Sequence, residues 1–304
     1  MKNTIQNVIE NLPQFNMQQA YDAVEAAGLA AKKPSIRARV YEAVDRGILK
    51  KIAKGVYRNE DCLLIQGDGK DLSFLADGSI DAIITDHPYE DKKANNGGDR
   101  HFATYDCFRY TQQDFNEKAR VLKDGCFLVE FLPEESSTNF DYIYQIKKMA
   151  EAAGFKYYAK VPWKKGTFIS NCGRKSKNTE DVMIFSKGDA RSLRPDAKKD
   201  KAEPGVAHFM KGAAGMLPTV FDFQKPGKKE MIHQAEKPVE LLEAIINYVT
   251  QEGELVLDQF AGSGSLGAAA KATHRRCILI ELADEFISKI QTRLGVKPVD
   301  PALV

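Results

Sequence analysis

The architecture of this chain can be read from residues 254–270, ELVLDQFAGSGSLGAAA. An apolar run typical of a β-strand ends at Asp258, glycines follow at positions 262 and 264, and an alanine-rich helical stretch begins. Glycines at such a strand-to-helix turn let the backbone approach a ligand closely. The spacing differs from the GxGxxG of dinucleotide-binding folds and lacks the Gly-Lys-Ser/Thr of a P-loop. Alone, the turn is equally typical of any tight strand–helix connection.

The next apolar run, CILIEL at residues 277–282, supports the interpretation of this turn as a ligand-binding turn. It carries Glu281 at its end, about 20 residues beyond the glycines. An acid in that place can hydrogen-bond the hydroxyls of a ribose. A surface acid at the end of a strand is the alternative interpretation.

A second segment with chemical potential is IDAIITDHPYEDK, residues 80–92. Asp86 ends an apolar run, and Pro88 disfavours the α conformation at His87, so the His87 carbonyl should have a fixed direction. A carboxylate, a carbonyl and the ring of Tyr89 then lie within four residues and suit a planar ring that bears an amino group. In isolation, these four residues also fit a strand-ending turn with a packed tyrosine.

Short apolar runs alternate with helical stretches from about residue 61 onward. The runs are LLIQ (63–66), IDAIIT (80–85), CFLVEF (126–131), DVMIFS (181–186), ELVLDQF (254–260) and CILIEL (277–282). Amphipathic stretches at 141–153 and 239–250 lie between them. Nearly continuous apolar strands suit a parallel sheet buried on both faces, so we predict a three-layer α/β domain.

Residues 1–60 differ from the rest and predict a small separate module. Helical spacing at 16–27 and 35–46, with Ser35 as N-cap, is followed by a hairpin around Gly55. This order resembles a winged helix-turn-helix. Nine Lys and Arg against two acids between residues 32 and 58 make a local field suited to phosphates. A solvated helical face is the alternative.

Composition excludes several classes of protein. In 304 residues, 44 Lys and Arg against 42 Asp and Glu leave a net charge of +2, so nucleic-acid binding can be argued only from local clusters. Five scattered cysteines without a CxxC pair predict reduced thiols and a cytoplasmic location. No zinc-type spacing and no apolar run of about 20 residues occurs, so we expect neither a metal site nor a membrane span.

Taken together, DHPY (86–89), HQAEKP (233–238) and FAGSG (260–264) resemble the β-class amino-methyltransferases of DNA. The resemblance covers about residues 61–294. It implies a seven-stranded Rossmann-like sheet and methyl transfer from S-adenosylmethionine to adenine N6 or cytosine N4. We therefore expect residues 1–60 to be the winged-helix-like module and 61–295 the methyltransferase domain. Within the latter, about 187–232 would be a target-recognition insert, and 296–304 would be a tail.

The resemblance also assigns site residues. The methionine and adenosine parts of the cofactor would be held by Asp258, Phe260, Gly262 and Gly264. Glu281 would bind the ribose, and Asp68 would lie near the adenine. The motif that precedes the cofactor strand falls on His233, Lys237 and Pro238, which the resemblance also assigns to the cofactor site. The catalytic tetrapeptide is Asp86, His87, Pro88 and Tyr89.

One position departs from the family pattern, because His87 stands where the family has its first proline. The family uses the main-chain carbonyl there, which histidine also has, although the locked φ of proline is lost. The imidazole adds a group that could titrate near neutrality beside the target. We expect methyl transfer to be retained; an impaired, DNA-binding homologue is the alternative.

The expected reaction is direct in-line transfer to a base flipped out of double-stranded DNA, with Tyr89 stacked on it. The Asp-first tetrapeptide favours adenine N6 over cytosine N4 by resemblance, and RNA or a protein amide is a further alternative acceptor. Residues 90–108 could close over the base, and the basic residues of 160–178 could contact phosphates. A homodimer and a restriction endonuclease partner stay open.

Overall fold

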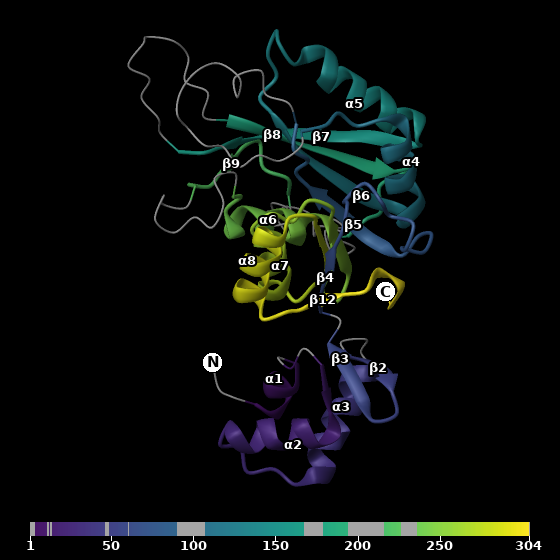
Figure 1. Ribbon diagram of the computed structural model, residues 1–304. Coiled ribbons are helices and arrows are strands. Elements are labelled where there is room, and N and C mark those ends of the chain that lie inside the picture. Colours follow the sequence, from purple (N-terminus) through teal and green to yellow (C-terminus); the bar gives the residue numbers. More distant parts are fainter. Residues whose placement is uncertain are drawn as a thin grey trace, which may run out of the picture.

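The computed structural model describes residues 4–10, 12, 14–45, 49–59, 61–89, 107–166, 179–193, 216–225 and 236–303. Its main body is a large mixed sheet flanked by helices, above a small N-terminal module (Figure 1). The α/β prediction is confirmed.

The large sheet has nine strands in the order β12-β4-β11-β10-β5-β6-β8-β7-β9. Seven strands have four or more residues: β4 (Cys62–Gln66), β5 (Ile80–Thr85), β6 (Leu122–Pro133), β7 (Phe155–Lys164), β8 (Thr179–Lys187), β10 (Leu255–Asp258) and β11 (Arg276–Glu281). β8 runs antiparallel to both neighbours, and the other pairings are parallel. The two strands beyond the expected seven are two-residue edge pieces, β9 (Phe221–Asp222) and β12 (Pro298–Val299).

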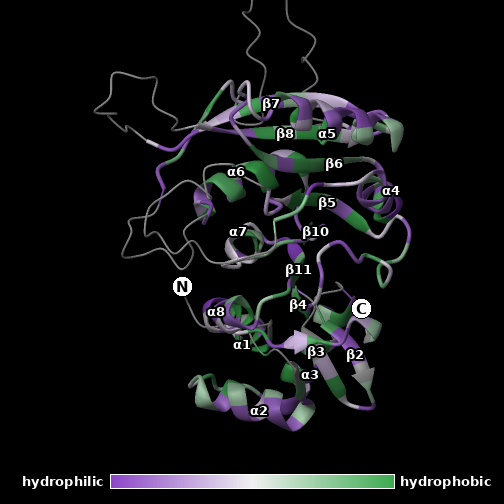
Figure 2. Cartoon of the chain, turned by 45° about the horizontal axis from the view of Figure 1, so that its top comes forward, coloured by the Kyte–Doolittle hydropathy of each residue, from purple (hydrophilic) through white to green (hydrophobic). Residues whose placement is uncertain are grey.

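Helices cover both faces of this sheet, as continuous apolar strands require. α6 (Val239–Val249), α7 (Ser265–Ala272) and α8 (Asp284–Leu294) pack on one face. The opposite face is covered by α4 (Gln112–Val121) and α5 (Phe140–Ala152). Successive strand residues alternate between the two cores: Leu64 belongs to the first, and Leu63 and Ile65 to the second. Figure 2 shows the resulting hydrophobic colouring of β8.

The parallel strands place their following loops at one edge of the sheet. β4, β5, β10 and β11 are adjacent and run in one direction, so their carboxyl ends meet there. The residues that follow or end these strands are Asp68, Asp86, Asp258 and Glu281. Ligands of open α/β sheets bind at this edge. The fold therefore gathers four acids that are far apart in the sequence.

The N-terminal module has its own hydrophobic core. Its helices are α1 (Ile5–Glu10), α2 (Met17–Ala26) and α3 (Lys33–Asp45), and its antiparallel sheet has the order β1 (Gln14–Asn16), β3 (Val56–Asn59), β2 (Leu49–Ala53). The β2–β3 turn uses Gly55 at φ +73°, where glycine is favoured. α3 begins two residues before the expected cap Ser35, because Pro34 is well tolerated in a first helical turn.

Two further expectations differ from the structure. β7 is missing from the predicted strands, and residues 298–299 of the expected tail pair with β4. The chain closes with a 3₁₀ turn at Pro301–Leu303. Within the described ranges, every helix is too short or too polar to cross a bilayer.

Candidate active site

The glycine turn between β10 and α7 is held by two carboxylates. Asp258 accepts hydrogen bonds from the Phe260 amide (3.1 Å) and the Thr85 hydroxyl (3.2 Å). Burial raises the pKa of Asp258 to about 7, although both hydrogen bonds oppose the rise. On the other side of the turn, Glu281 accepts the Gly262 amide at 2.8 Å and the Ala283 amide at 2.9 Å. Gly264, in the left-handed conformation at φ +74°, caps α7.

The loop after β4 packs against this turn. Gln259 Nε2 donates to the Gly69 carbonyl at 2.6 Å, and Asp68 accepts the Lys70 amide at 3.0 Å. A Cβ on Gly69 would lie 1.9 Å from the Gln259 carbonyl oxygen. Only glycine fits there, because the backbone of the loop lies directly against Gln259 and the Phe260 ring.

Asp86 lies in an ion-pair cluster that the sequence did not predict. Lys237 Nζ lies 2.5 Å from Asp86 Oδ2 and 3.1 Å from Glu180 Oε2. The other oxygen, Asp86 Oδ1, is buried and has no hydrogen-bond partner within the described part of the chain. Burial raises the pKa of Asp86, and Lys237 opposes the rise. One carboxylate oxygen is thus anchored by Lys237, while the other is left without a partner among the described residues.

Glu180 is a neighbour of this cluster that the sequence alone does not identify. Burial would raise its pKa, but Lys237 and Lys165 together lower it to about 2. Glu180 therefore stays ionised and balances the charge of Lys237. The only sequence signal was an acid at the start of a strand predicted to be apolar, in TEDVMIFS. That signal has no partner until the fold brings Lys237 beside it.

The His87 side chain lies inside the protein. It is 1% exposed, its Nε2 lies 2.8 Å from the Tyr142 hydroxyl, and its ring centroid lies 4.1 Å from that of Tyr110. Burial and the charge of Lys118 lower the pKa of His87 well below its ordinary value. The expectation that this imidazole titrates near neutrality is therefore wrong, because desolvation penalises the charged ring.

A buried ion pair lies next to the His87 ring, on the side of its Nδ1. Lys118 binds Glu130, both side chains are fully buried, and the Tyr110 hydroxyl lies 3.3 Å from Glu130 Oε2. The Lys118 ammonium also lies 3.6 Å from the Tyr110 ring centroid. Aromatic ring and carboxylate together compensate the buried cation.

Several predicted residues lie outside the described ranges. These are His233, residues 90–106 of the expected lid, most of 187–232, and 167–178 of the basic stretch. The described lysines of that stretch are paired with acids. Lys160 lies near Asp181 and Glu135, Lys164 near Asp222, and Lys165 near Glu180. These ion pairs hold the described lysines within the protein, and phosphate contacts of the stretch stay a prediction.

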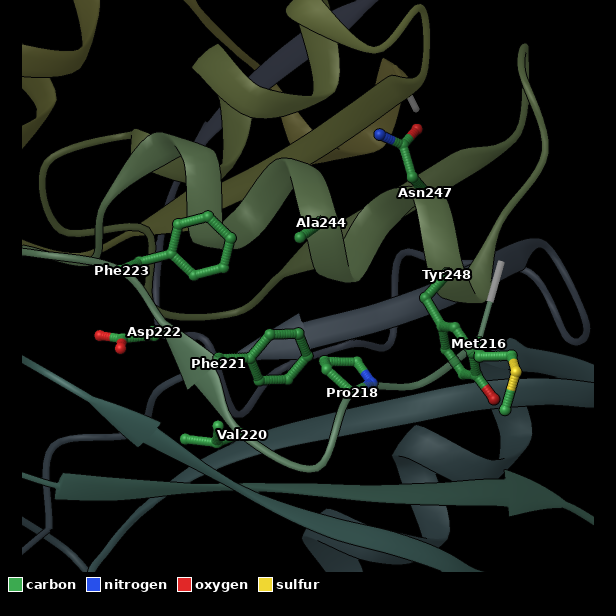
Figure 3. A pocket seen from close by; sticks show the side chains of 9 residues that line it. All are labelled: Met216, Pro218, Val220, Phe221, Asp222, Phe223, Ala244, Asn247 and Tyr248. Atoms are coloured by element: carbon green, nitrogen blue, oxygen red, sulfur yellow. The ribbon is translucent and has the colours of Figure 1, made fainter. Parts of the chain in front are cut away.

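A cavity of about 440 Å³ lies between α6 and the segment around β9. Figure 3 shows the rings of Phe221, Phe223 and Tyr248 around it. The predicted site residues do not line it. Most of its lining falls within 216–223, inside the expected target-recognition insert.

Comparison with known proteins identifies the family of the chain. Residues 80–292 match the DNA methylase family, N6_N4_Mtase. The Type II methyltransferase M.HpaI of Haemophilus parainfluenzae is 26% identical over 229 residues, which cover 74% of this chain and 71% of that protein. The Type II methyltransferase M2.LlaDCHI of Lactococcus lactis subsp. cremoris is 27% identical over 257 residues, 80% of this chain and 93% of that protein.

Solved structures share the fold. The M1.HpyAVI-SAM complex has a TM-score of 0.54 at 23% identity, covering 77% of this chain and 100% of that one. PvuII DNA methyltransferase (cytosine-N4-specific) has a TM-score of 0.55 at 17% identity, covering 80% and 91%. The family match spans most of the chain and includes the Asp86 tetrapeptide and the glycine turn. This chain therefore belongs to the DNA methylase family and is a β-class DNA amino-methyltransferase, a class whose methyl donor is S-adenosylmethionine.

Proposed function

We propose that this protein methylates the N6 amine of adenine in double-stranded DNA, on a base flipped out of the helix. The observation that carries the proposal is the free oxygen of Asp86. It is a buried acceptor without a donor in the described structure, at the strand edge where ligands bind. A buried acceptor without a donor is costly, so a site of this kind is suited to receive an N–H from a ligand. The Asp-first tetrapeptide supports adenine over cytosine.

The residues at the neighbouring strand ends fit S-adenosylmethionine. Asp258 suits the ammonium group of its methionine end, and Glu281 suits ribose hydroxyls once its bonds to the turn rearrange. Gly262 has open space where a side chain would otherwise stand, which leaves room for the ligand. When bound, the cofactor supplies an electrophilic methyl group.

The chain's own residues prepare the acceptor amine. Its lone pair is delocalised into the ring, which makes it a poor nucleophile. Hydrogen bonds to Asp86 Oδ1 and the His87 carbonyl draw the nitrogen toward tetrahedral geometry and localise the lone pair. Because burial raises the pKa of Asp86, Oδ1 is suited to hold the proton that the amine sheds. Tyr89 stacks on the base.

The N-terminal module would supply part of the DNA contact. Its order of helices and strands fits a winged helix in which α3 is the recognition helix and β2–β3 the wing. Lys33 and Arg37 on α3 are exposed, as are Lys50 and Lys54 of the hairpin, whereas the exposed Arg39 is paired with Glu42. Both elements thus present cations to a phosphate backbone. A homodimer, a restriction endonuclease partner and a cytoplasmic location stay predictions of the sequence.

Labelled S-adenosylmethionine and unmodified genomic DNA test the acceptor. After digestion to nucleosides, we expect N6-methyladenine. Detection of N4-methylcytosine instead would show that cytosine is the acceptor. Label in RNA or protein alone would overturn the DNA assignment. Asp86→Ala should bind the cofactor without turnover. Tyr89→Ala should lose far more activity than Tyr89→Phe if the ring stacks on the base.

Salt dependence tests the module. Replacing Lys50 and Lys54 by alanine should weaken DNA binding and reduce the slope of log affinity against log salt by about one per lost phosphate contact. The matched control replaces Lys147 and Lys148 of α5. Equal effects in both pairs would remove the module from the DNA interface.

A further inference from the structure

We propose that Tyr142 is a positioning residue, which holds the His87 main-chain oxygen in place by anchoring the His87 side chain. The inference rests on the proposed function, since that oxygen is a ligand of the target amine there. It assigns a role to a tyrosine of α5, which lies in a different part of the sequence from the tetrapeptide.

The need for an anchor follows from the residue type. A proline at position 87 would fix φ through its ring, whereas histidine leaves φ free to rotate. Pro88 restricts His87 to extended conformations but does not select one of them. The Phe108 amide donates to the Pro88 carbonyl at 3.0 Å, which ties down the residue that follows. The direction of the His87 carbonyl therefore depends on what holds the side chain.

The contacts of the imidazole meet that need. The Tyr110 ring lies against the imidazole with 36° between the ring planes, and the rings of Phe108 and Tyr89 lie 5.8 and 5.7 Å away between centroids. These ring contacts confine the imidazole but have no fixed direction, so they do not stop it from sliding in its plane. The bond to the Tyr142 hydroxyl, at 2.8 Å, is the directional contact that stops this sliding.

Tyr142 is itself hydrogen-bonded to the segment that precedes α4. Its hydroxyl accepts the Tyr110 amide at 3.1 Å and so has its proton available for His87 Nε2. With the Tyr142 proton on that bond, the proton of the neutral ring resides on Nδ1, which faces Glu130 Oε2 at 3.8 Å and makes no hydrogen bond within the described residues. The opposite tautomer would turn a lone pair toward that carboxylate. The geometry thus forms a chain from Tyr110 through Tyr142 and His87 toward Glu130, which Lys118 binds.

A double-mutant cycle on the full-length protein tests the role. Tyr142→Phe should lower kcat for DNA methylation roughly tenfold, the value of one hydrogen bond, and leave the KM for S-adenosylmethionine unchanged. The same change is then made in a His87→Pro protein. There, Tyr142→Phe should change kcat less than twofold relative to His87→Pro alone, because the ring of proline fixes φ. Tyr144→Phe is the matched control, since Tyr144 is exposed on the same helix, and it should have no effect.

Equal losses in both backgrounds would show that Tyr142 acts independently of His87 and would overturn the inference. So would unchanged kcat in Tyr142→Phe. A second readout needs no activity: ¹⁵N-labelled imidazole spectra should show His87 as the neutral Nδ1–H tautomer from pH 6 to 8, with the Nε2 resonance shifted in Tyr142→Phe. An unshifted resonance would overturn the anchor. Wild-type protein inactive on all DNA would overturn the proposed function instead, and the spectra would still decide whether Tyr142 binds His87.

Discussion

Lys237 and Asp86 are 151 residues apart in the chain, and their side chains meet with Nζ 2.5 Å from Oδ2. The contact distinguishes the two oxygens of Asp86, because Lys237 binds Oδ2 while Oδ1 has no hydrogen-bond partner within the described residues and is the oxygen that we propose receives the target amine. Lys237 was expected in the cofactor pocket from its motif. Its observed partners are Asp86 and Glu180, at the catalytic strand end.

Replacing Lys237 by methionine should therefore affect catalysis more than cofactor binding. The change leaves two buried carboxylates without their shared cation, and breaking such a pair costs about 3–5 kcal/mol of stability. Loss of the cation also raises the pKa of Asp86 further, so the residual methylation rate should increase with pH between 6 and 9. Rates over that range, with melting temperatures, check this. Lys164→Met, at an exposed pair with Asp222, is the control and should behave as wild type. A pH-independent residual rate would contradict the assignment.

Asp258 predicts a pH dependence of cofactor affinity. Its pKa of about 7 means that the carboxyl is largely protonated below neutrality, while an ammonium ligand requires the ionised form. Affinity for S-adenosylmethionine should therefore fall as pH drops below about 7, approaching tenfold per pH unit. Calorimetric titration without DNA from pH 5.5 to 8.5 measures this. Asp258→Asn should bind weakly and lose the dependence. A flat profile in the wild type would remove Asp258 from the ammonium site.

Much of the fold was readable because both sheet faces are buried. Six continuous apolar runs correspond to β4, β5, β6, β8, β10 and β11. The sequence does not predict β7, because its residues FKYYAKVPWK contain no apolar run. β7 lies near the sheet edge, and only Phe155, Val161 and Trp163 are buried along it. The two-residue strands at the edges carry no periodicity at all.

The site residues likewise fall into those that the sequence predicts and those that it does not. Asp86, Asp258 and Glu281 could be placed because each ends an apolar run, and strand ends of a parallel sheet converge. Glu180, Lys118 and Glu130 could not, because their roles come from partners contributed by other elements. The state of His87 was misjudged for the same reason, since its burial depends on residues 110 and 142 rather than on its neighbours in the chain.

Gly69 should be a stability determinant of the site. An alanine there would place Cβ 1.9 Å from the Gln259 carbonyl oxygen, and backbone must move to relieve the clash. We expect a loss of about 1–3 kcal/mol in unfolding free energy, together with weaker cofactor binding. Denaturant unfolding measures the first and titration the second. Gly67→Ala is the matched control, because a Cβ there meets nothing within 4 Å. Equal stability of the two variants would mean that the loop shifts without cost.

Arg293 should support the cofactor turn from α8. Its guanidinium lies 2.6 Å from Glu236 Oε1, 3.2 Å from the Ser265 hydroxyl and 3.3 Å from the Ser263 carbonyl. One group thus links the segment before α6 to both sides of Gly264. Arg293→Met removes the guanidinium from the buried Glu236 and from the turn, which should lower the melting temperature and weaken cofactor binding roughly tenfold. Lys289→Met, on the same helix but paired with Glu285, is the control. If Arg293→Met lost stability but bound the cofactor as tightly as wild type, the residue would brace the fold alone, and the turn would keep its shape through Asp258 and Glu281.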